Sequence, residues 1–135
     1  MDSIKRYYRI QNIIYFSLVL ITVASAFFIY QYTNTAWLSF RQAENFYNQK
    51  RYSDAIVFYK KSLEQKNTIY SGQLRLAESY VAIGEFANAV VWYKHYLKAH
   101  PNDKRAHLSL ARALTWNLDY KEAEQEYKNL EKLNE

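Results

Sequence analysis

The side chains of this 135-residue chain that could do chemistry are few and poorly spaced for catalysis. Its three histidines are His95, His100 and His107. Five residues of helix turn the first two about 140° away from each other, so a zinc site built from them would be poor, and we expect ordinary surface histidines. The glutamates at positions 122, 124 and 126 also point in different directions along a helix, and we expect them to form a solvated face.

Other kinds of active site lack the residues that they need. The chain has no cysteine, which excludes disulfides, thiolate metal ligands and cysteine nucleophiles. Its two glycines leave no glycine-rich loop to cradle a phosphate. No nucleophile lies beside a base at a recognisable spacing. The sequence therefore predicts a protein that is not an enzyme, with no catalytic residue, no metal and no cofactor.

Composition predicts that these residues are carried on helices. The chain has only two glycines and one proline, whereas average proteins have about 7% glycine and about 5% proline. It also has fourteen tyrosines. Rossmann folds, β-sandwiches and disordered linkers need more of both residues. We therefore expect an all-α fold with aromatic-rich packing.

The net charge of +5 is unevenly distributed along the chain. Near the start of the chain there is one acidic residue, Asp2, and three basic residues, Lys5, Arg6 and Arg9. Residues 11–38 carry no charge at all. In the rest of the chain basic and acidic residues are mixed, without the concentrated basic face of a nucleic-acid binder. No nucleic-acid partner is expected.

The uncharged segment predicts a membrane span. Residues 13–30 read IIYFSLVLITVASAFFIY, whose only polar side chains are hydroxyls that can bond back to carbonyls within a helix. Eighteen residues of helix cover about 27 Å, close to the roughly 30 Å of the hydrocarbon core. Aromatic residues near both ends favour the interface, and these are Tyr15, Tyr30, Tyr32 and Trp37. We assign residues 13–32 as a single transmembrane helix.

Two other interpretations of this segment are open. One is a buried core helix. The other is a cleaved signal peptide with Ala24-Ser25-Ala26 as its cleavage site, although the apolar run continues through Phe27, Phe28 and Ile29.

The flanking charges predict the orientation of the span. Lys5, Arg6 and Arg9 lie just before it, and the first basic residue after it is Arg41. By the positive-inside rule, residues 1–12 form a cytoplasmic basic tail and the rest of the chain is extracytoplasmic. In a bacterium this is the periplasmic or outer face of the inner membrane.

The remainder of the chain repeats with a period of 34 residues. Four sets of similar residues, which we call the repeat columns, recur at this interval. They are Ala43, Ala77, Ala111; Ala55, Ala89, Ala123; Tyr52, Phe86, Tyr120; and Tyr59, Tyr93, Tyr127. Alanine lets two helices approach closely, and the ring fills the space beside that contact. The register gives repeats at 36–69, 70–103 and 104–135, each long enough for two short helices with their turns.

At these positions the chain resembles the tetratricopeptide repeat family, whose pattern is W-x2-L-G-x2-Y…A-x3-F…P. Repeat two matches best, with Leu76-Ala77-x-x-Tyr80, Ala89-x3-Tyr93 and Pro101. No repeat has the first tryptophan, and only repeat two has the turn glycine, Gly84. Lys50 and Leu118 occupy the glycine site elsewhere, the latter between the turn formers Asn117 and Asp119. The resemblance implies three helical hairpins in a right-handed α-solenoid.

The resemblance also implies a concave groove, lined by the first helix of each repeat, that takes extended peptides or partner helices. The matching positions are Trp37, Phe40, Glu44 and Tyr47, then Leu74, Glu78 and Val81, then Arg105, Leu108, Arg112 and Trp116. Aromatic residues and arginines are the usual anchors of interfaces. The alternative is that Trp37 and Phe40 contact the membrane surface and the arginines are merely solvated. Chaperone adaptors of the family clamp a C-terminal carboxylate with Lys and Asn, and because Phe40, Glu44 and Glu78 stand there instead, that ligand is not expected.

Two boundaries of the repeats carry further expectations. Residues 33–35, Thr-Asn-Thr, favour N-caps, so we expect a short kink or a cap between the span and the first repeat. Soluble arrays usually finish with a polar capping helix, whereas here Tyr127, Leu130 and Leu133 have little to cover them. Either this end frays, or a partner or a second copy of the chain docks there.

These features predict a non-catalytic, membrane-anchored adaptor or scaffold that binds partner proteins in the assembly of a bacterial envelope complex. One alternative is an accessory subunit of an exopolysaccharide synthesis or export machine, because residues 110–127 resemble repeats in such systems. Another is a receptor on an organelle membrane, which the flanking charges disfavour.

Overall fold

The computed structural model describes residues 2–133, and at positions 2, 3, 5 and 31–33 it describes the backbone without the side chain. The described residues form six helices and no strand, which confirms the all-α prediction. The helices are α1 (Asp2–Asn48), α2 (Tyr52–Gln65), α3 (Tyr70–Ala82), α4 (Phe86–Ala99), α5 (Lys104–Trp116) and α6 (Tyr120–Lys132). The chain divides into two compact units, Met1–Thr35 and Ala36–Glu135, and α1 contributes to both.

The first unit contains a helical segment that is long and apolar enough to cross a membrane. This segment, Arg6–Tyr30, has a mean hydropathy of 2.3, and none of its most apolar window is buried. The hydroxyls of Ser17, Thr22 and Ser25 each donate to the carbonyl three residues earlier, at 2.8, 2.8 and 2.9 Å. The expected bonding of these hydroxyls within the helix is therefore confirmed, and it leaves them compatible with an apolar surrounding.

The N-cap expected at residues 33–35 is wrong, because α1 continues as helix through all three residues. The Asn34 side chain instead donates from Nδ2 to the carbonyl of Tyr30, one turn earlier, at 2.9 Å. Asn34 thus bonds to a carbonyl of the preceding turn rather than to the free N–H groups that begin a helix. With no glycine or proline before Gly72, nothing in the sequence ends the helix at this point.

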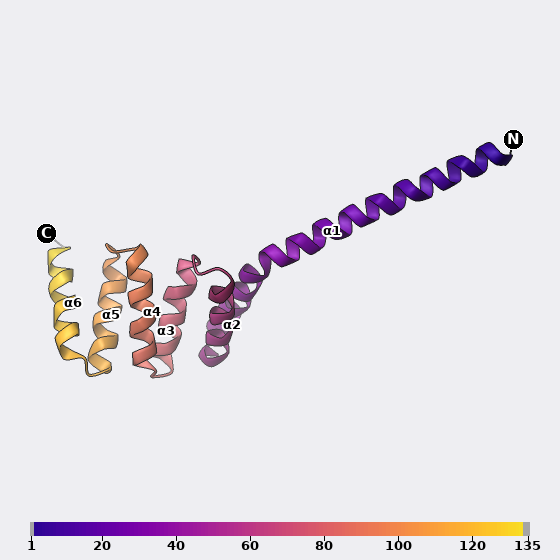
Figure 1. Ribbon diagram of the computed structural model, residues 1–135. Coiled ribbons are helices and arrows are strands. Elements are labelled where there is room, and N and C mark those ends of the chain that lie inside the picture. The colour runs from indigo at the N-terminus through magenta and orange to yellow at the C-terminus, as the bar shows by residue number, and fades with distance from the viewer. Residues whose placement is uncertain (1, 134–135) are drawn as a thin grey trace. The chain divides into compact units, whose positions relative to one another are not determined.

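In the second unit, residues 36–48 of α1 and the helices α2 to α6 form three antiparallel hairpins (Figure 1). Successive helices pack side by side from α2 to α6. The turns within hairpins lie along one edge of the array, and the loops between hairpins lie along the other (Figure 1). The six alanines of the repeat columns are at most 3% exposed, as expected for small residues packed between helices: Ala43, Ala55, Ala77, Ala89, Ala111 and Ala123.

The turn within each hairpin uses a left-handed residue at the same repeat position. Gly84 has φ +79°, and Lys50 and Leu118 have φ values of 60° and 67°. Each donates its N–H to a carbonyl three residues earlier, at 2.8 to 3.1 Å. Asn117 and Asp119 were expected to form the third turn, but Leu118 itself adopts the left-handed conformation while Asn117 donates to Asp119 across it at 2.6 Å. The tight connection between paired helices thus requires this conformation whatever residue occupies the site.

The loop before α5 contains a cap that sequence reasoning missed. Asp103 Oδ1 accepts hydrogen bonds from the backbone N–H groups of Arg105 and Ala106 at 3.0 and 3.1 Å, and Oδ2 accepts one from the Tyr96 hydroxyl at 2.9 Å. Burial would raise the pKa of Asp103, but these donors outweigh it and hold the pKa below its ordinary value. Asp103 therefore stabilises the start of α5 as a carboxylate.

Candidate functional site

The eleven groove positions lie on the first helix of each hairpin. Trp37, Phe40, Glu44 and Tyr47 are on α1, Leu74, Glu78 and Val81 on α3, and Arg105, Leu108, Arg112 and Trp116 on α5. On each helix they are spaced three or four residues apart, so they share one face. All eleven are exposed or half-buried, so each is accessible. We call this face the groove face.

Aromatic residues on α1 form the first part of the groove face. Trp37 is 43% exposed and meets Phe40 edge to face, with ring centroids 5.8 Å apart. The ring centroid of Phe40 in turn lies 5.9 Å from that of Tyr59, and Tyr59 is fully buried. The Lys66 ammonium lies 5.5 Å from the centre of the Trp37 ring. The Trp37 indole is thus held in place while much of it stays accessible.

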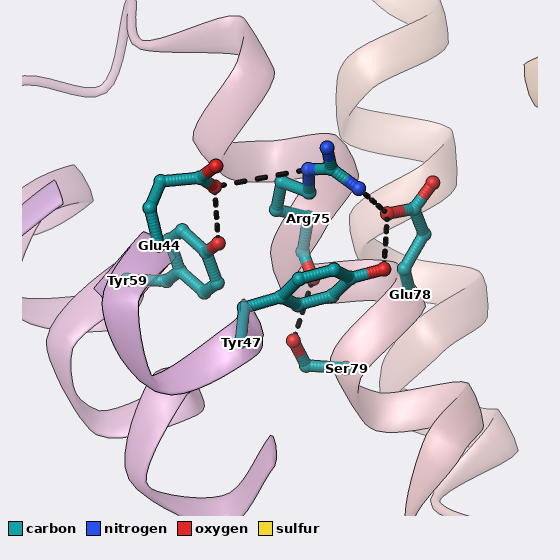
Figure 2. A network of polar contacts seen from close by, with 6 residues as sticks. All are labelled: Glu44, Tyr47, Tyr59, Arg75, Glu78 and Ser79. Atoms are coloured by element: carbon teal, nitrogen blue, oxygen red, sulfur yellow. Dashed lines mark hydrogen bonds and ion pairs between the residues drawn. The ribbon is translucent and has the colours of Figure 1, made fainter. Parts of the chain in front are cut away.

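The middle of the groove face is a polar network centred on Arg75 (Figure 2). The guanidinium Nε lies 3.7 Å from Glu44, and Nη1 donates to Glu78 at 3.0 Å. Glu44 also accepts a hydrogen bond from the Tyr59 hydroxyl, and Glu78 accepts one from the Tyr47 hydroxyl at 3.0 Å. These residues come from α1, α2 and α3, so the network ties the first hairpin to the second. We call these five residues the Arg75 network.

The electrostatics of the Arg75 network favour neutral tyrosines and a charged guanidinium. Burial, with the hydrogen bond and charge of Glu44, raises the pKa of Tyr59 far above its ordinary value. Burial and the charge of Glu78 likewise raise the pKa of Tyr47. Burial alone would lower the pKa of Arg75, but the hydrogen bond and charge of Glu78 outweigh it and raise that pKa. Glu44 and Glu78 therefore already have partners within the protein.

The Arg75 network was only partly visible in the sequence. Its glutamates and Tyr47 were among the predicted groove positions, but Arg75 and Tyr59 were missed. The spacing of Arg75 and Glu78, three residues apart on one helix, is a signal that could have been used. The contact from Tyr47 to Glu78 spans 31 residues and required the packing of α1 against α3.

The last part of the groove face is basic. Arg105 and Arg112 are exposed on α5, a helix with no acidic residue, and Leu108 lies half-buried between them. Trp116 continues the same line, 51% exposed, with its ring centroid 5.3 Å from that of Phe86. We call Arg105, Leu108, Arg112 and Trp116 the α5 stripe.

The nearby glutamates do not neutralise the α5 stripe. On α6, Glu122 pairs with Lys94 at 2.5 Å, Glu124 with Lys128 at 2.6 Å and Glu126 with His107 at 2.7 Å. Neither Arg105 nor Arg112 makes an ion pair within residues 2–133. The α5 stripe therefore presents two accessible positive charges beside an accessible indole.

The expectation of ordinary surface histidines is wrong for His100 and His107. The His107 side chain is 13% exposed, with Nδ1 2.7 Å from Glu126 and Nε2 2.8 Å from the carbonyl of Pro101. His100 stacks on Tyr96, with ring centroids 4.5 Å apart. Glu126, only 19% exposed, is likewise not part of a solvated face. The described residues contain no group of three or more metal-ligating side chains.

The outer side of α6 is the other surface predicted from the sequence. Tyr127 is 40% exposed, and Leu130 and Leu133 are half-buried. Ala123 is the one buried residue of α6. These apolar side chains are partly accessible on the last described hairpin.

Comparison with known proteins agrees with this architecture. Residues 71–113 match the family model of the tetratricopeptide repeat. No curated protein matches the chain. Among solved structures, a MamA mutant is similar with a TM-score of 0.70 at 20% identity, over 76% of this chain and 74% of that one. The first TPR of Spaghetti (RPAP3), bound to the HSP90 peptide SRMEEVD, has a TM-score of 0.66 at 18% identity, over 75% and 80%. The Arabidopsis OM64 TPR domain has a TM-score of 0.66 at 16% identity, over 75% and 84%.

At such identities these structures are evidence for the fold alone. The 34-residue register, the three hairpins with buried alanines at the repeat positions, and the family match over residues 71–113 all agree. Residues 71–113 therefore match the tetratricopeptide repeat, and the second unit has the tetratricopeptide fold of paired helices.

Proposed function

We propose that this protein is a non-catalytic, membrane-anchored adaptor whose groove face binds a partner protein during the assembly of a bacterial envelope complex. The tetratricopeptide fold itself suggests an adaptor for protein–protein interaction. The observation that carries the proposal is the α5 stripe, because it combines an accessible indole with two arginines that lack an ion pair in the described chain. Trp and Arg are the residue types most enriched among the anchors of protein interfaces.

Charge predicts the chemistry of the partner. The two carboxylates of α1 and α3 on the groove face share a single cation, Arg75, so this part of the face keeps one negative charge and the positive charge of the face lies on α5. Arg105 and Arg112 are seven residues apart, which on a helix is about 10.5 Å. A partner segment with two carboxylates at about that separation, and an apolar side chain for Trp116, fits this face best.

The membrane anchor in this proposal is the segment Arg6–Tyr30. Lys5, Arg6 and Arg9 before the span favour a cytoplasmic N-terminus, which would hold the repeat unit on the extracytoplasmic side. Alkaline phosphatase fused after residue 135 should be active and a green fluorescent protein fused there should be dark. The reverse pattern would overturn the orientation. The intact mass of protein extracted from membranes should include residues 1–26, and their loss would identify a cleaved signal peptide instead.

Site-specific photocross-linking in membranes tests the groove face. A photoreactive phenylalanine at Arg112 or Trp116 should form an adduct with a partner protein, whereas the same residue at Lys98, exposed on α4, should not. The double variant R105E/R112E should lose the partner in affinity purification. K98E/K121E carries the same change in net charge on exposed positions outside the groove face and should retain it. Equal adducts at all three sites, or a partner that survives R105E/R112E, would refute the assignment.

A further inference from the structure

A second candidate binding site lies away from the groove face. A surface pocket of about 260 Å³ is enclosed by α2, α4 and the start of α3. Leu63 from α2, Asn67 from the following loop, Gln73 from α3 and Trp92 from α4 contribute to its walls. None of the eleven groove positions lines it. The pocket therefore lies between the first and second hairpins and is separate from the groove face.

The sequence explains why there is space here. The repeat pattern begins with a tryptophan three residues before its leucine, and in repeat two Gln73 occupies that position before Leu76. An indole in this place would fill far more volume than the glutamine side chain. What remains beside Gln73 is walled by Leu63, 6% exposed, and by the half-buried ring of Trp92. The pocket thus lies where the pattern places an aromatic ring.

Gln73 also brings an unsatisfied hydrogen-bond acceptor to this position. Its side chain is 7% exposed, and Nε2 donates to the carbonyl of Asn67 at 2.7 Å. That bond determines which end of the amide is nitrogen, since the reverse orientation would set two oxygens against each other. The remaining atom, Oε1, is buried and accepts no hydrogen bond from the described residues. A buried carbonyl without a donor is rare in folded proteins and is stabilised by any ligand that supplies one.

We propose that this pocket binds one aromatic side chain with an N–H or O–H donor, a Trp or Tyr presented by a partner protein. A volume of about 260 Å³ lies below the roughly 300–1,000 Å³ of pockets for drug-sized ligands and suits a single ring. Lys60 and Glu64 bring opposite charges to the walls, and His95 adds an imidazole whose ring centroid lies 5.5 Å from that of Trp92, a lining that favours an uncharged guest. Trp92 supplies an aromatic wall, and the Gln73 side chain, whose Oε1 is buried in the empty pocket, would turn this oxygen toward the guest to supply the acceptor. The bound ring would replace, from another molecule, the tryptophan that repeat two lacks.

Binding is tested with two pairs of soluble probes that differ only in the donor. The full chain, isotope-labelled and held in phospholipid nanodiscs, is titrated with N-acetyltryptophanamide and with its indole N-methyl derivative. N-acetyltyrosinamide and N-acetylphenylalaninamide form the second pair. The donor-bearing probes should shift the NMR signals of the Gln73 side-chain amide and the Trp92 indole N–H. Each donor-bearing probe should bind about fivefold more tightly than the matched probe without the donor, a difference that corresponds to one net hydrogen bond.

Variants at Gln73 distinguish the contribution of the hydrogen-bond acceptor from that of the open volume. Gln73→Met keeps the length and removes the acceptor, so it should bind both probes of a pair equally. Gln73→Trp fills the pocket with its own ring and should bind neither. Gln125→Met, a matched change on the exposed face of α6, should behave like the unaltered chain.

Three results would overturn the proposal. The first is that no probe shifts the signals of Gln73 or Trp92, which would mean that Oε1 holds a water at most. The second is that probes with and without the donor bind the unaltered chain equally. The third is that binding survives in Gln73→Trp with its helical content intact. If Gln73→Trp does not fold, the comparison of the unaltered chain with Gln73→Met still decides.

Discussion

Replacing Gly84 by alanine tests whether backbone conformation alone sets the stability of the turn within the second hairpin. Gly84 has φ +79°, and an added Cβ would meet no atom within 4 Å, so alanine would suffer no steric clash. Holding a residue with a side chain in the left-handed region costs about 1–2 kcal/mol. The smaller entropy loss of alanine on folding returns about 0.5–1 kcal/mol of that cost. We expect the free energy of unfolding to fall by about 1 kcal/mol.

The equivalent turn of the first hairpin offers the reverse experiment. Lys50 is exposed and has φ 60°, so Lys50→Gly should relieve the strain and raise the free energy of unfolding by about 0.5–1 kcal/mol. Lys50→Ala is the matched control, because it removes the side chain, keeps the left-handed strain and should change little.

Thermal unfolding of the full chain in detergent micelles, followed by tryptophan fluorescence, measures these effects. For a repeat unit of this size, a change of 1 kcal/mol moves the Tm by about 4–8 °C. Gly84→Ala should lower the Tm and Lys50→Gly should raise it. If Gly84→Ala leaves the Tm within about 1 °C of the unaltered chain, or Lys50→Gly lowers it, the assignment of strain to this repeat position is refuted.

Three other predictions concern polar groups of the repeat unit. Arg75→Met should leave Glu44 and Glu78 without a cation and lower the free energy of unfolding by about 1 kcal/mol in urea titrations, while Arg75→Lys should lose less. Asp103→Ala should cost about 1 kcal/mol at neutral pH. Because the folded pKa of Asp103 is lowered, its contribution is present above the unfolded pKa of about 4 and is lost as the pH falls through the folded value, so the two chains should converge in acid. Burial raises the pKa of Tyr93 to about 12, so its stabilising contribution should be complete below about pH 10 and disappear as the pH rises through 12. Tyr93→Phe should remove that part of the alkaline transition in pH-dependent unfolding and one late step in ultraviolet titration.

Local features of the fold could be predicted because they depend on short-range patterns. The alanine columns at 34-residue intervals identified buried packing positions, and the uncharged run after Arg9 identified the apolar helix, whose hydroxyls bond as expected. The cap at residues 33–35 was predicted from residue preference alone, and it failed because a continuous helix satisfies those backbone groups better. The left-handed φ of Leu118 was missed for a similar reason, since hairpin packing outweighs the residue's own preference.

The candidate site divides in the same way between local and long-range information. Sequence alone determined which face of α1, α3 and α5 carries the groove positions, because a helix places residues three and four apart on one side. Only the tertiary structure decided that Glu44 and Glu78 already have partners while Arg105 and Arg112 have none in the described chain, because Tyr59, Tyr47 and Arg75 reach the glutamates from other helices.

The pocket beside Gln73 illustrates the same limit. The sequence shows that the first tryptophan of the repeat pattern is absent, but not whether neighbouring side chains close the space that its absence leaves. The packing of α2 against α3 and of α3 against α4 leaves that space open and a buried oxygen unpaired. Whether a space closes depends on the combined volumes of side chains from several helices, which short-range sequence patterns do not encode.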